Sequence, residues 1–103
     1  MPIFAGDGTE LAERTTEKLK KPEDYRVILL NDNYTTREFV VEILMLIFQK
    51  SFEDATRIML DVHRRGKGTA GIYTYDIAVT KVRQVHEIAK KYEFPLRCIV
   101  EEA

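Results

Sequence analysis

A short polar stretch and one distant histidine are the residues of this chain best suited to bind a ligand. Asn31, Asp32 and Asn33 are consecutive, Thr35 follows closely, and His63 belongs to a later segment. Side-chain carbonyls, a carboxylate and a neutral imidazole nitrogen all accept hydrogen bonds, so they would suit a donor-rich cation such as an ammonium. The alternative for the loop is turn chemistry, in which Asn and Asp close the turn and Thr35 caps the next helix. Spacing alone favours the turn but leaves the ligand site open.

Other residues with reactive side chains have simpler structural interpretations. His63 lies near the end of a predicted helix, where a histidine is more often structural than a ligand. Met59 and Val62 share the apolar face of that helix and are expected to be core, although Met59 could equally line a pocket. Cys98 alternates with apolar residues in a strand pattern, which indicates a small buried hydrophobe rather than a nucleophile. The basic run at 64–67 is expected to be a solvated helix end.

Composition excludes several classes of function. The chain has 103 residues, with 16 Lys and Arg against 17 Asp and Glu, so it lacks the overall charge that attracts nucleic acid or an anionic membrane. No apolar run approaches the roughly 20 residues that span a bilayer, and no secretory signal pattern is present, so a cytoplasmic location is expected. One cysteine and two histidines exclude a disulfide framework and a Cys- and His-rich zinc site. Without a phosphate-binding or nucleophile motif, the sequence predicts neither an enzyme nor a bound metal or cofactor.

The chain divides into two regions. Residues 1–24 are rich in charge and poor in apolar residues after Phe4, which is typical of a mobile tail with at most a weak helix at 10–20. Residues 25–103 carry regular apolar patterns and are predicted to form one folded domain. A domain of about 80 residues is near the lower limit for a self-sufficient core.

The folded region is predicted to contain three strands. Runs of branched aliphatic residues that end at turn formers indicate strands over 25–31, 69–73 and 96–100. The first is apolar on both faces and is expected to be central or covered. Gly71 marks a bulge or a close backbone approach in the second.

Three helices are predicted between these strands. They are expected to begin at the N-caps Thr35, Ser51 and Thr74, each with an acidic residue in the first turn, and the second helix ends at the glycines at 66–68. The resulting order is β-α-α-β-α-β, a small α+β domain in which a three-stranded antiparallel sheet packs against three helices. The predicted buried face of the last helix consists of Ile77, Ala78, Val82, Val85, Ile88 and Ala89.

Six segments of the folded region occur in an order and spacing that is more specific together than any one alone. They are VILLNDNYT at 27–35, EFV at 38–40, MLDVH at 59–63, GK at 66–67, GIYT at 71–74 and PL at 95–96. In these segments the chain resembles the ClpS adaptors, from about Tyr25 to its C-terminus. The resemblance implies a protein that is not an enzyme. It implies an adaptor that recognises destabilising N-terminal residues of substrate proteins (Phe, Tyr, Trp and Leu) and passes the substrates to a ClpA-type AAA+ unfoldase, which feeds the ClpP protease.

The resemblance also assigns residues to the two parts of a substrate site. The ammonium group of the substrate N-terminus would be bound by Asn31, Asp32, His63 and Asn33. The hydrophobic pocket for the first side chain would be formed by Val40, Met59, Val62, Leu96, Arg37 and Thr35. An acidic first residue should be excluded, because its carboxylate would lose water without gaining a partner.

A second surface and two departures follow from the same resemblance. Asp76 and Lys81, at the start of the third helix, would contact the N-terminal domain of the unfoldase, and the adaptor is expected to be a monomer. The family loop commonly reads N-D-D, whereas Asn33 removes one negative charge here. Arg37 stands where the family often has a methionine that bounds the pocket. Because arginine stacks on aromatic rings, we expect a changed preference among bulky first residues, in favour of aromatic ones.

Two other functions are compatible with the residues taken alone. One is a protein-binding module of the small ribosome-associated α+β type, which would have this fold without a pocket. The other is a hydrolase that uses His63 as general base with Asp32. The hydrolase needs a nucleophile, and its candidates Thr35 and Cys98 are better explained as a helix cap and a core residue.

Overall fold

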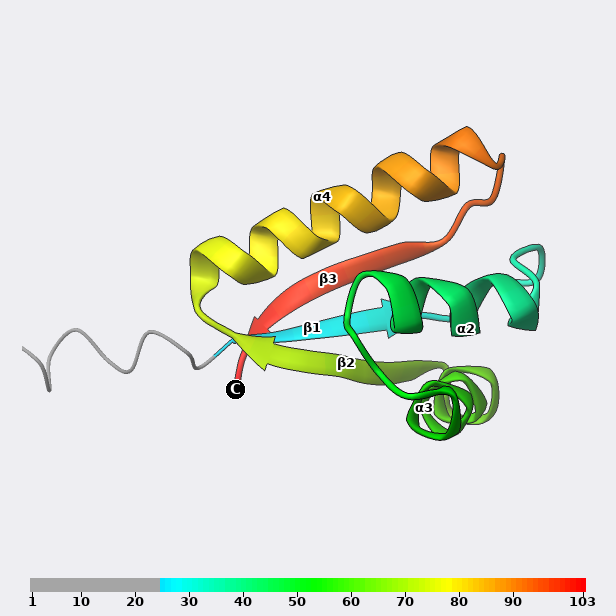
Figure 1. Ribbon diagram of the computed structural model, residues 1–103, viewed down its shortest axis with the longest axis horizontal. Coiled ribbons are helices and arrows are strands. Elements are labelled where there is room, and N and C mark those ends of the chain that lie inside the picture. The colour runs from blue at the N-terminus through cyan, green and yellow to red at the C-terminus, as the bar shows by residue number, and fades with distance from the viewer. Residues whose placement is uncertain (1–24) are drawn as a thin grey trace, which may run out of the picture.

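The computed structural model describes residues 25–103, and its elements follow the predicted order (Figure 1). The strands are β1 (Tyr25–Leu30), β2 (Lys67–Tyr73) and β3 (Arg97–Glu102), and the helices are α2 (Arg37–Leu46), α3 (Phe52–Arg65) and α4 (Tyr75–Lys91). The predicted α+β fold is therefore confirmed. The tail predicted over 1–24, with its weak helix, lies outside the described residues.

The predicted central strand is β1, in an antiparallel sheet of order β2-β1-β3. Val27 and Leu29 are fully buried on one face of β1, and Ile28 on the other face is only 4% exposed, as expected for a strand that is apolar on both faces. The pairing with β2 shifts after Val27, so that Ala70 has no partner in the register and forms a bulge beside Gly71. A Cβ atom at Gly71 would also clash with the Tyr73 side chain. Of the two alternatives predicted for Gly71, the bulge is present, whereas its close contact is with a side chain and not with backbone.

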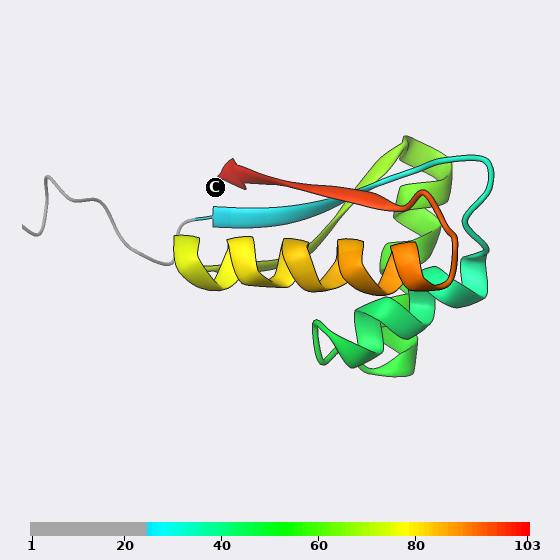
Figure 2. The same ribbon diagram turned by 90° about the horizontal axis from the view of Figure 1, so that it is seen from above.

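The helices occupy different parts of the sheet. In Figures 1 and 2, α4 runs along the strands, while α2 and α3 lie together near the end of the sheet where β1 finishes and β2 begins. The core forms between these layers, and α2 contributes the largest share of it. The buried residues of α2 and the turn that follows it are Val40, Val41, Ile43, Leu44, Ile47 and Phe48.

Local capping chemistry sets most of the helix ends. The hydroxyl of Ser51 accepts a hydrogen bond from the backbone N–H of Asp54 at 3.1 Å, and the hydroxyl of Thr74 caps α4 in the same way. Gly66 ends α3 in the left-handed conformation with φ of 91°, which a residue without a Cβ adopts most easily. These three predicted boundaries are confirmed.

The prediction that Ile77 of α4 is buried is wrong. Ile77 is 47% exposed, whereas Ala78, Val85 and Ala89 are buried. These three residues define the stripe that faces the sheet. Ile77 precedes Ala78 by one residue and is therefore rotated by about 100° around the helix axis, away from that stripe.

Lys81 ties α4 to the end of α2. Its ammonium donates a hydrogen bond to the backbone carbonyl of Ile47 at 2.6 Å, where α2 ends. The same nitrogen lies 5.7 Å from the ring centroid of Phe48 and 5.3 Å from that of Tyr73. A positive charge near a helix C-terminus and over aromatic faces is favourable, so this half-buried lysine joins α2, α4 and β2.

His86 ties α4 to β3. Its Nε2 atom lies 3.1 Å from the backbone nitrogen of Cys98. A backbone N–H only donates, so the ring is neutral with Nε2 as the acceptor. Burial, and to a smaller extent the charge of Arg97, lowers the pKa of His86 below its ordinary value of 6.5.

The Lys81 contacts generate a stability prediction. Replacing Lys81 with Met keeps an apolar stem of similar size but removes the hydrogen bond and the contacts with the rings. We expect Lys81→Met to lower the free energy of unfolding by about 1–2 kcal/mol in urea denaturation. The matched control is Arg83→Met, an exposed position on the same helix. Equal stabilities for the two variants would show that the Lys81 contacts contribute nothing.

The lowered pKa of His86 generates a pH prediction. Because the unfolded chain takes up this proton at a higher pH than the folded chain, the stabilisation is complete above about pH 6.5 and is lost as the pH falls through the lowered pKa. His86→Gln cannot take up the proton. The wild type should therefore lose more stability than His86→Gln between about pH 7.5 and pH 5, as measured by urea denaturation. A constant difference between the two proteins would contradict this assignment.

Candidate functional site

The loop between β1 and α2 is organised by the carboxylate of Asp32. One oxygen, Oδ1, accepts hydrogen bonds from the backbone N–H groups of Tyr34 at 2.8 Å and Thr35 at 2.7 Å, and Oδ2 accepts one from the Thr35 hydroxyl at 2.8 Å. Burial opposes ionisation of Asp32, but these hydrogen bonds outweigh it and lower the carboxyl pKa below 3.8. The predicted turn chemistry is present, and Asp32 is a fixed negative charge at neutral pH.

The first helix cap differs from the predicted one. Thr36, not Thr35, caps α2: its hydroxyl accepts a hydrogen bond from the backbone N–H of Phe39 at 3.1 Å. The Thr35 hydroxyl is already committed to the carboxylate of Asp32. Two consecutive threonines leave the choice of cap undetermined in the sequence, and the carboxylate three residues earlier decides it.

This loop, the start of α2 and the end of α3 enclose a pocket of about 450 Å³. The structure brings together there every residue predicted for the substrate site except Leu96. Tyr34, Thr36 and Glu38 also line the pocket, although the sequence analysis did not single them out. These three residues could have been predicted to line the pocket from their positions within the predicted loop and the start of the predicted helix. The complete lining is Asn31, Asp32, Asn33, Tyr34, Thr35, Thr36, Arg37, Glu38, Val40, Met59, Val62 and His63.

The pocket is apolar inside and polar at its edge. Val40 and Val62 are buried and Met59 is half-buried. The side chains of Asn31 and Asn33 are exposed, like most of the polar residues of the lining. An apolar group could therefore enter the interior while a polar or charged group remains at the mouth.

His63 and Arg37 meet across the mouth of the pocket. The Nη2 atom of Arg37 lies 2.7 Å from Nε2 of His63, and both side chains are exposed. A guanidinium can only donate, so Nε2 of His63 is the acceptor and the proton of the neutral ring is on Nδ1. His63 is thus a hydrogen-bond acceptor at the pocket and not a buried core residue.

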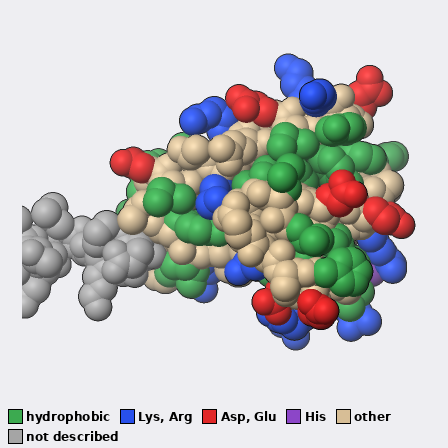
Figure 3. All heavy atoms as spheres, viewed as in Figure 1, with side chains coloured by type: hydrophobic (Ala, Val, Ile, Leu, Met, Phe, Trp, Pro, Cys, Tyr) green, Lys and Arg blue, Asp and Glu red, His purple; other side chains and the backbone are tan. Residues whose placement is uncertain are grey.

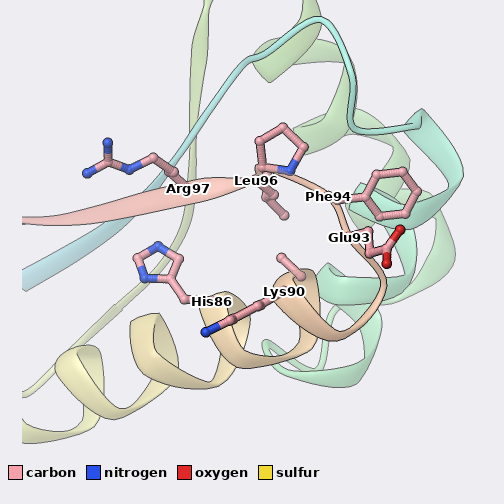
Figure 4. A pocket seen from close by; sticks show the side chains of 8 residues that line it. His86, Lys90, Glu93, Phe94, Leu96 and Arg97 are labelled. Atoms are coloured by element: carbon pink, nitrogen blue, oxygen red, sulfur yellow. The ribbon is translucent and has the colours of Figure 1, made fainter.

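Leu96 is placed differently from the expectation. Its side chain is 3% exposed and lines a separate hollow of about 550 Å³ between the end of α4 and the start of β3. In Figure 4 it points from the chain before β3 toward α4, while the charged groups of Lys90 and Arg97 lie on the opposite side of the view from the carboxylate of Glu93. The charged groups that line this hollow do not converge on one point.

The two candidate nucleophiles of a hydrolase have structural roles. The hydroxyl of Thr35 is bonded to Asp32. Burial raises the pKa of the Cys98 thiol to about 12, so the nucleophilic thiolate is essentially absent at neutral pH. Cys98 is the small buried hydrophobe that the strand pattern predicts.

The residues predicted for a second interface lie on α4. Asp76 is exposed in the first turn, and Lys81 is half-buried. The start of α4 lies at the opposite end of the sheet from the loop that lines the pocket (Figure 1). Lys81 has a structural role within the domain, because its ammonium is bonded to the backbone of Ile47.

The surface carries charges of both signs. On the face drawn in Figure 3, basic and acidic side chains are interspersed rather than separated by sign. Among residues 25–103, no group of His, Cys, Asp and Glu could hold a metal ion. No helix in the same range is long and apolar enough to cross a membrane.

Comparisons with known proteins identify the family. The sequence profile of "ATP-dependent Clp protease adaptor protein ClpS" matches residues 20–99. The ATP-dependent Clp protease adapter protein ClpS of Syntrophus aciditrophicus is 58% identical over 93 residues, which cover 90% of this chain and 87% of the relative. The ClpS protein of Hyphomonas neptunium is 55% identical over 94% of this chain and 82% of its own length.

A solved structure agrees with the sequence relatives. Agrobacterium tumefaciens ClpS2 bound to L-phenylalaninamide is 37% identical to this chain and superposes with a TM-score of 0.77, covering 81% of this chain and all of its own. The named relatives are protease adaptors rather than enzymes. Fold and sequence together place this chain in the ClpS family, as an adaptor of the ATP-dependent Clp protease.

Proposed function

We propose that the pocket binds the free N-terminus of substrate proteins whose first residue is Phe, Tyr, Trp or Leu. The adaptor then delivers these substrates, in the cytoplasm, to a ClpA-type unfoldase for degradation by ClpP. The observation that carries the proposal is the convergence of hydrogen-bond acceptors and apolar side chains in one pocket. The L-phenylalaninamide bound by the solved relative supports it, because that compound has a free amine beside an aromatic side chain.

The polar edge suits an ammonium group. A protein N-terminus presents three N–H donors and a positive charge, and the edge offers the amide oxygens of Asn31 and Asn33 and the Nε2 atom of His63. An internal peptide bond has one N–H and no charge. Each charge-assisted hydrogen bond contributes about 1.5–3 kcal/mol, which is enough to separate the two kinds of ligand.

Asp32 contributes mainly as a fixed charge. Its two oxygens already accept three hydrogen bonds within the loop, so the carboxylate does not need to move when a ligand arrives. The lowered pKa keeps it ionised at neutral pH. A fixed negative charge beside the site favours a cation without a cost for ordering the side chain.

The apolar interior suits a large first side chain. Val40, Met59 and Val62 form it, and burial of a leucine or an aromatic ring there contributes about 1.5–3 kcal/mol. Leu96 has no part in this proposal because it does not line the pocket. The favoured order among Phe, Tyr, Trp and Leu, which Arg37 is expected to shift toward aromatic residues, stays a prediction.

Delivery requires a second surface that leaves the pocket free. We expect the N-terminal domain of the unfoldase to contact the start of α4, where Asp76 is exposed. This position is at the other end of the sheet from the pocket, so a monomer could hold substrate and unfoldase together (Figure 1).

The substrate site can be tested with matched peptides. In fluorescence anisotropy, a labelled peptide with a free N-terminal Phe should bind, and its N-acetylated twin should not. His63→Ala should weaken binding of the free-N-terminus peptide by at least about 10-fold, since one charge-assisted hydrogen bond is lost. Arg64→Ala, at an exposed neighbouring position outside the pocket, is the control and should bind as the wild type does. Equal affinity for the free and acetylated peptides would contradict the proposed ammonium site.

The docking surface can be tested separately. Asp76→Lys should weaken binding of the adaptor to the isolated N-terminal domain of a ClpA-type unfoldase, measured by calorimetry, by at least about 5-fold through charge reversal. Glu93→Lys, an exposed residue just after the opposite end of α4, is the control. Asp76 is the better probe than Lys81, whose substitution also changes stability. Equal losses for the two variants would mean that general charge, not this surface, determines docking.

A further inference from the structure

The contact between Arg37 and His63 occupies the site that a substrate would use. The guanidinium of Arg37 donates to Nε2 of His63 at 2.7 Å, and both residues line the pocket. This nitrogen has a single lone pair in the plane of the ring, so it accepts one strong hydrogen bond at a time. An incoming ammonium that bonds to His63 must displace Arg37, and repulsion between the two positive charges acts in the same direction.

The guanidinium of Arg37 is not held by an acidic side chain in the described part of the chain. Within residues 25–103, Arg37 forms no ion pair, and its hydrogen bond is with His63. Arg37 is the first residue of α2 and is exposed, so its side chain can turn outward without breaking any packing. It remains at the mouth of the pocket, where the substrate chain must leave.

The second residue of a bound substrate lies within reach of Arg37. Its Cα is about 3.8 Å from that of the first residue, and the first residue carries the ammonium bound beside His63. The negative charges of Asp32 and Glu38 also line the pocket and would repel an acidic residue there. A guanidinium at the same edge offsets this repulsion and can pair with a carboxylate through two parallel hydrogen bonds.

We propose that Arg37 determines specificity beyond the first residue. Released from His63 by the substrate ammonium, it pairs with a carboxylate of the substrate, so that the adaptor favours N-termini in which Asp or Glu follows the bulky first residue. This inference rests on the proposed function and adds a second position to the substrate class.

The experiment compares peptides that differ only at the second position. Labelled peptides beginning Phe-Glu, Phe-Gln and Phe-Lys are titrated with wild type, Arg37→Met and Arg37→Glu in fluorescence anisotropy. The wild type should bind Phe-Glu about 2- to 5-fold more tightly than Phe-Gln, as is typical of an exposed ion pair. Arg37→Met should abolish this ratio, and Arg37→Glu should reverse the preference toward Phe-Lys. Added salt should reduce the wild-type ratio.

Two further measurements keep the outcomes distinct. Arg37→Met should bind Phe-Gln no more weakly than the wild type, because no competitor for His63 remains. Arg64→Met, a charge change outside the pocket, should keep the Phe-Glu preference. A wild type without the preference, or an Arg37→Met variant that retains it, would overturn the inference while the proposed function stands. Failure of the wild type to bind any of the three peptides would overturn both.

Discussion

The carboxylate of Asp32 is the constraint from which the geometry of the pocket follows. By accepting hydrogen bonds from Tyr34 and Thr35 it closes the loop after β1 on itself. Because the Thr35 hydroxyl is bound there, Thr36 becomes the N-cap and α2 begins at Arg37. That starting point sets the guanidinium within hydrogen-bond distance of His63 on another helix. The end of one strand, one acid and two threonines thus determine which side chains form the mouth of the pocket.

The position of the pocket relative to the rest of the molecule depends on α4. This helix is held by Lys81 to the end of α2 and by His86 to the backbone of β3. Both contacts use polar atoms to join elements that are distant in sequence, and the apolar stripe of α4 covers the sheet between them. The pocket lies at one end of the sheet and the start of α4 at the other. In the proposed function, this separation lets one small domain contact a substrate and an unfoldase without either blocking the other.

The sequence correctly predicts features that neighbouring residues determine, and it fails for features that contacts between distant residues determine. The strand pattern of β1, the caps Ser51 and Thr74 and the stop at Gly66 depend on neighbouring residues, and all four are correct. The cap Thr36, the exposure of Ile77 and the position of Leu96 depend on which groups three-dimensional packing brings close. The resemblance to ClpS anticipated nearly all of the pocket lining, since it carries information about packing that spacing does not. It could not anticipate the Arg37–His63 contact, because arginine at this position departs from the family pattern.

An adaptor must release what it binds, and the Arg37–His63 contact bears on that requirement. A free substrate N-terminus in the proposed site gains one hydrogen bond to His63 but replaces the one that the empty protein already makes to Arg37. The net free energy of binding is smaller than the sum of the new contacts, since the internal bond must first be given up. The same exchange frees a guanidinium that was bonded before, and in the proposed second-position preference a substrate with a nearby carboxylate gives it a new partner. If the proposed second-position preference holds, Arg37 lowers affinity for N-termini without a nearby carboxylate and thereby raises discrimination among substrates, which suits an adaptor that selects and transfers them.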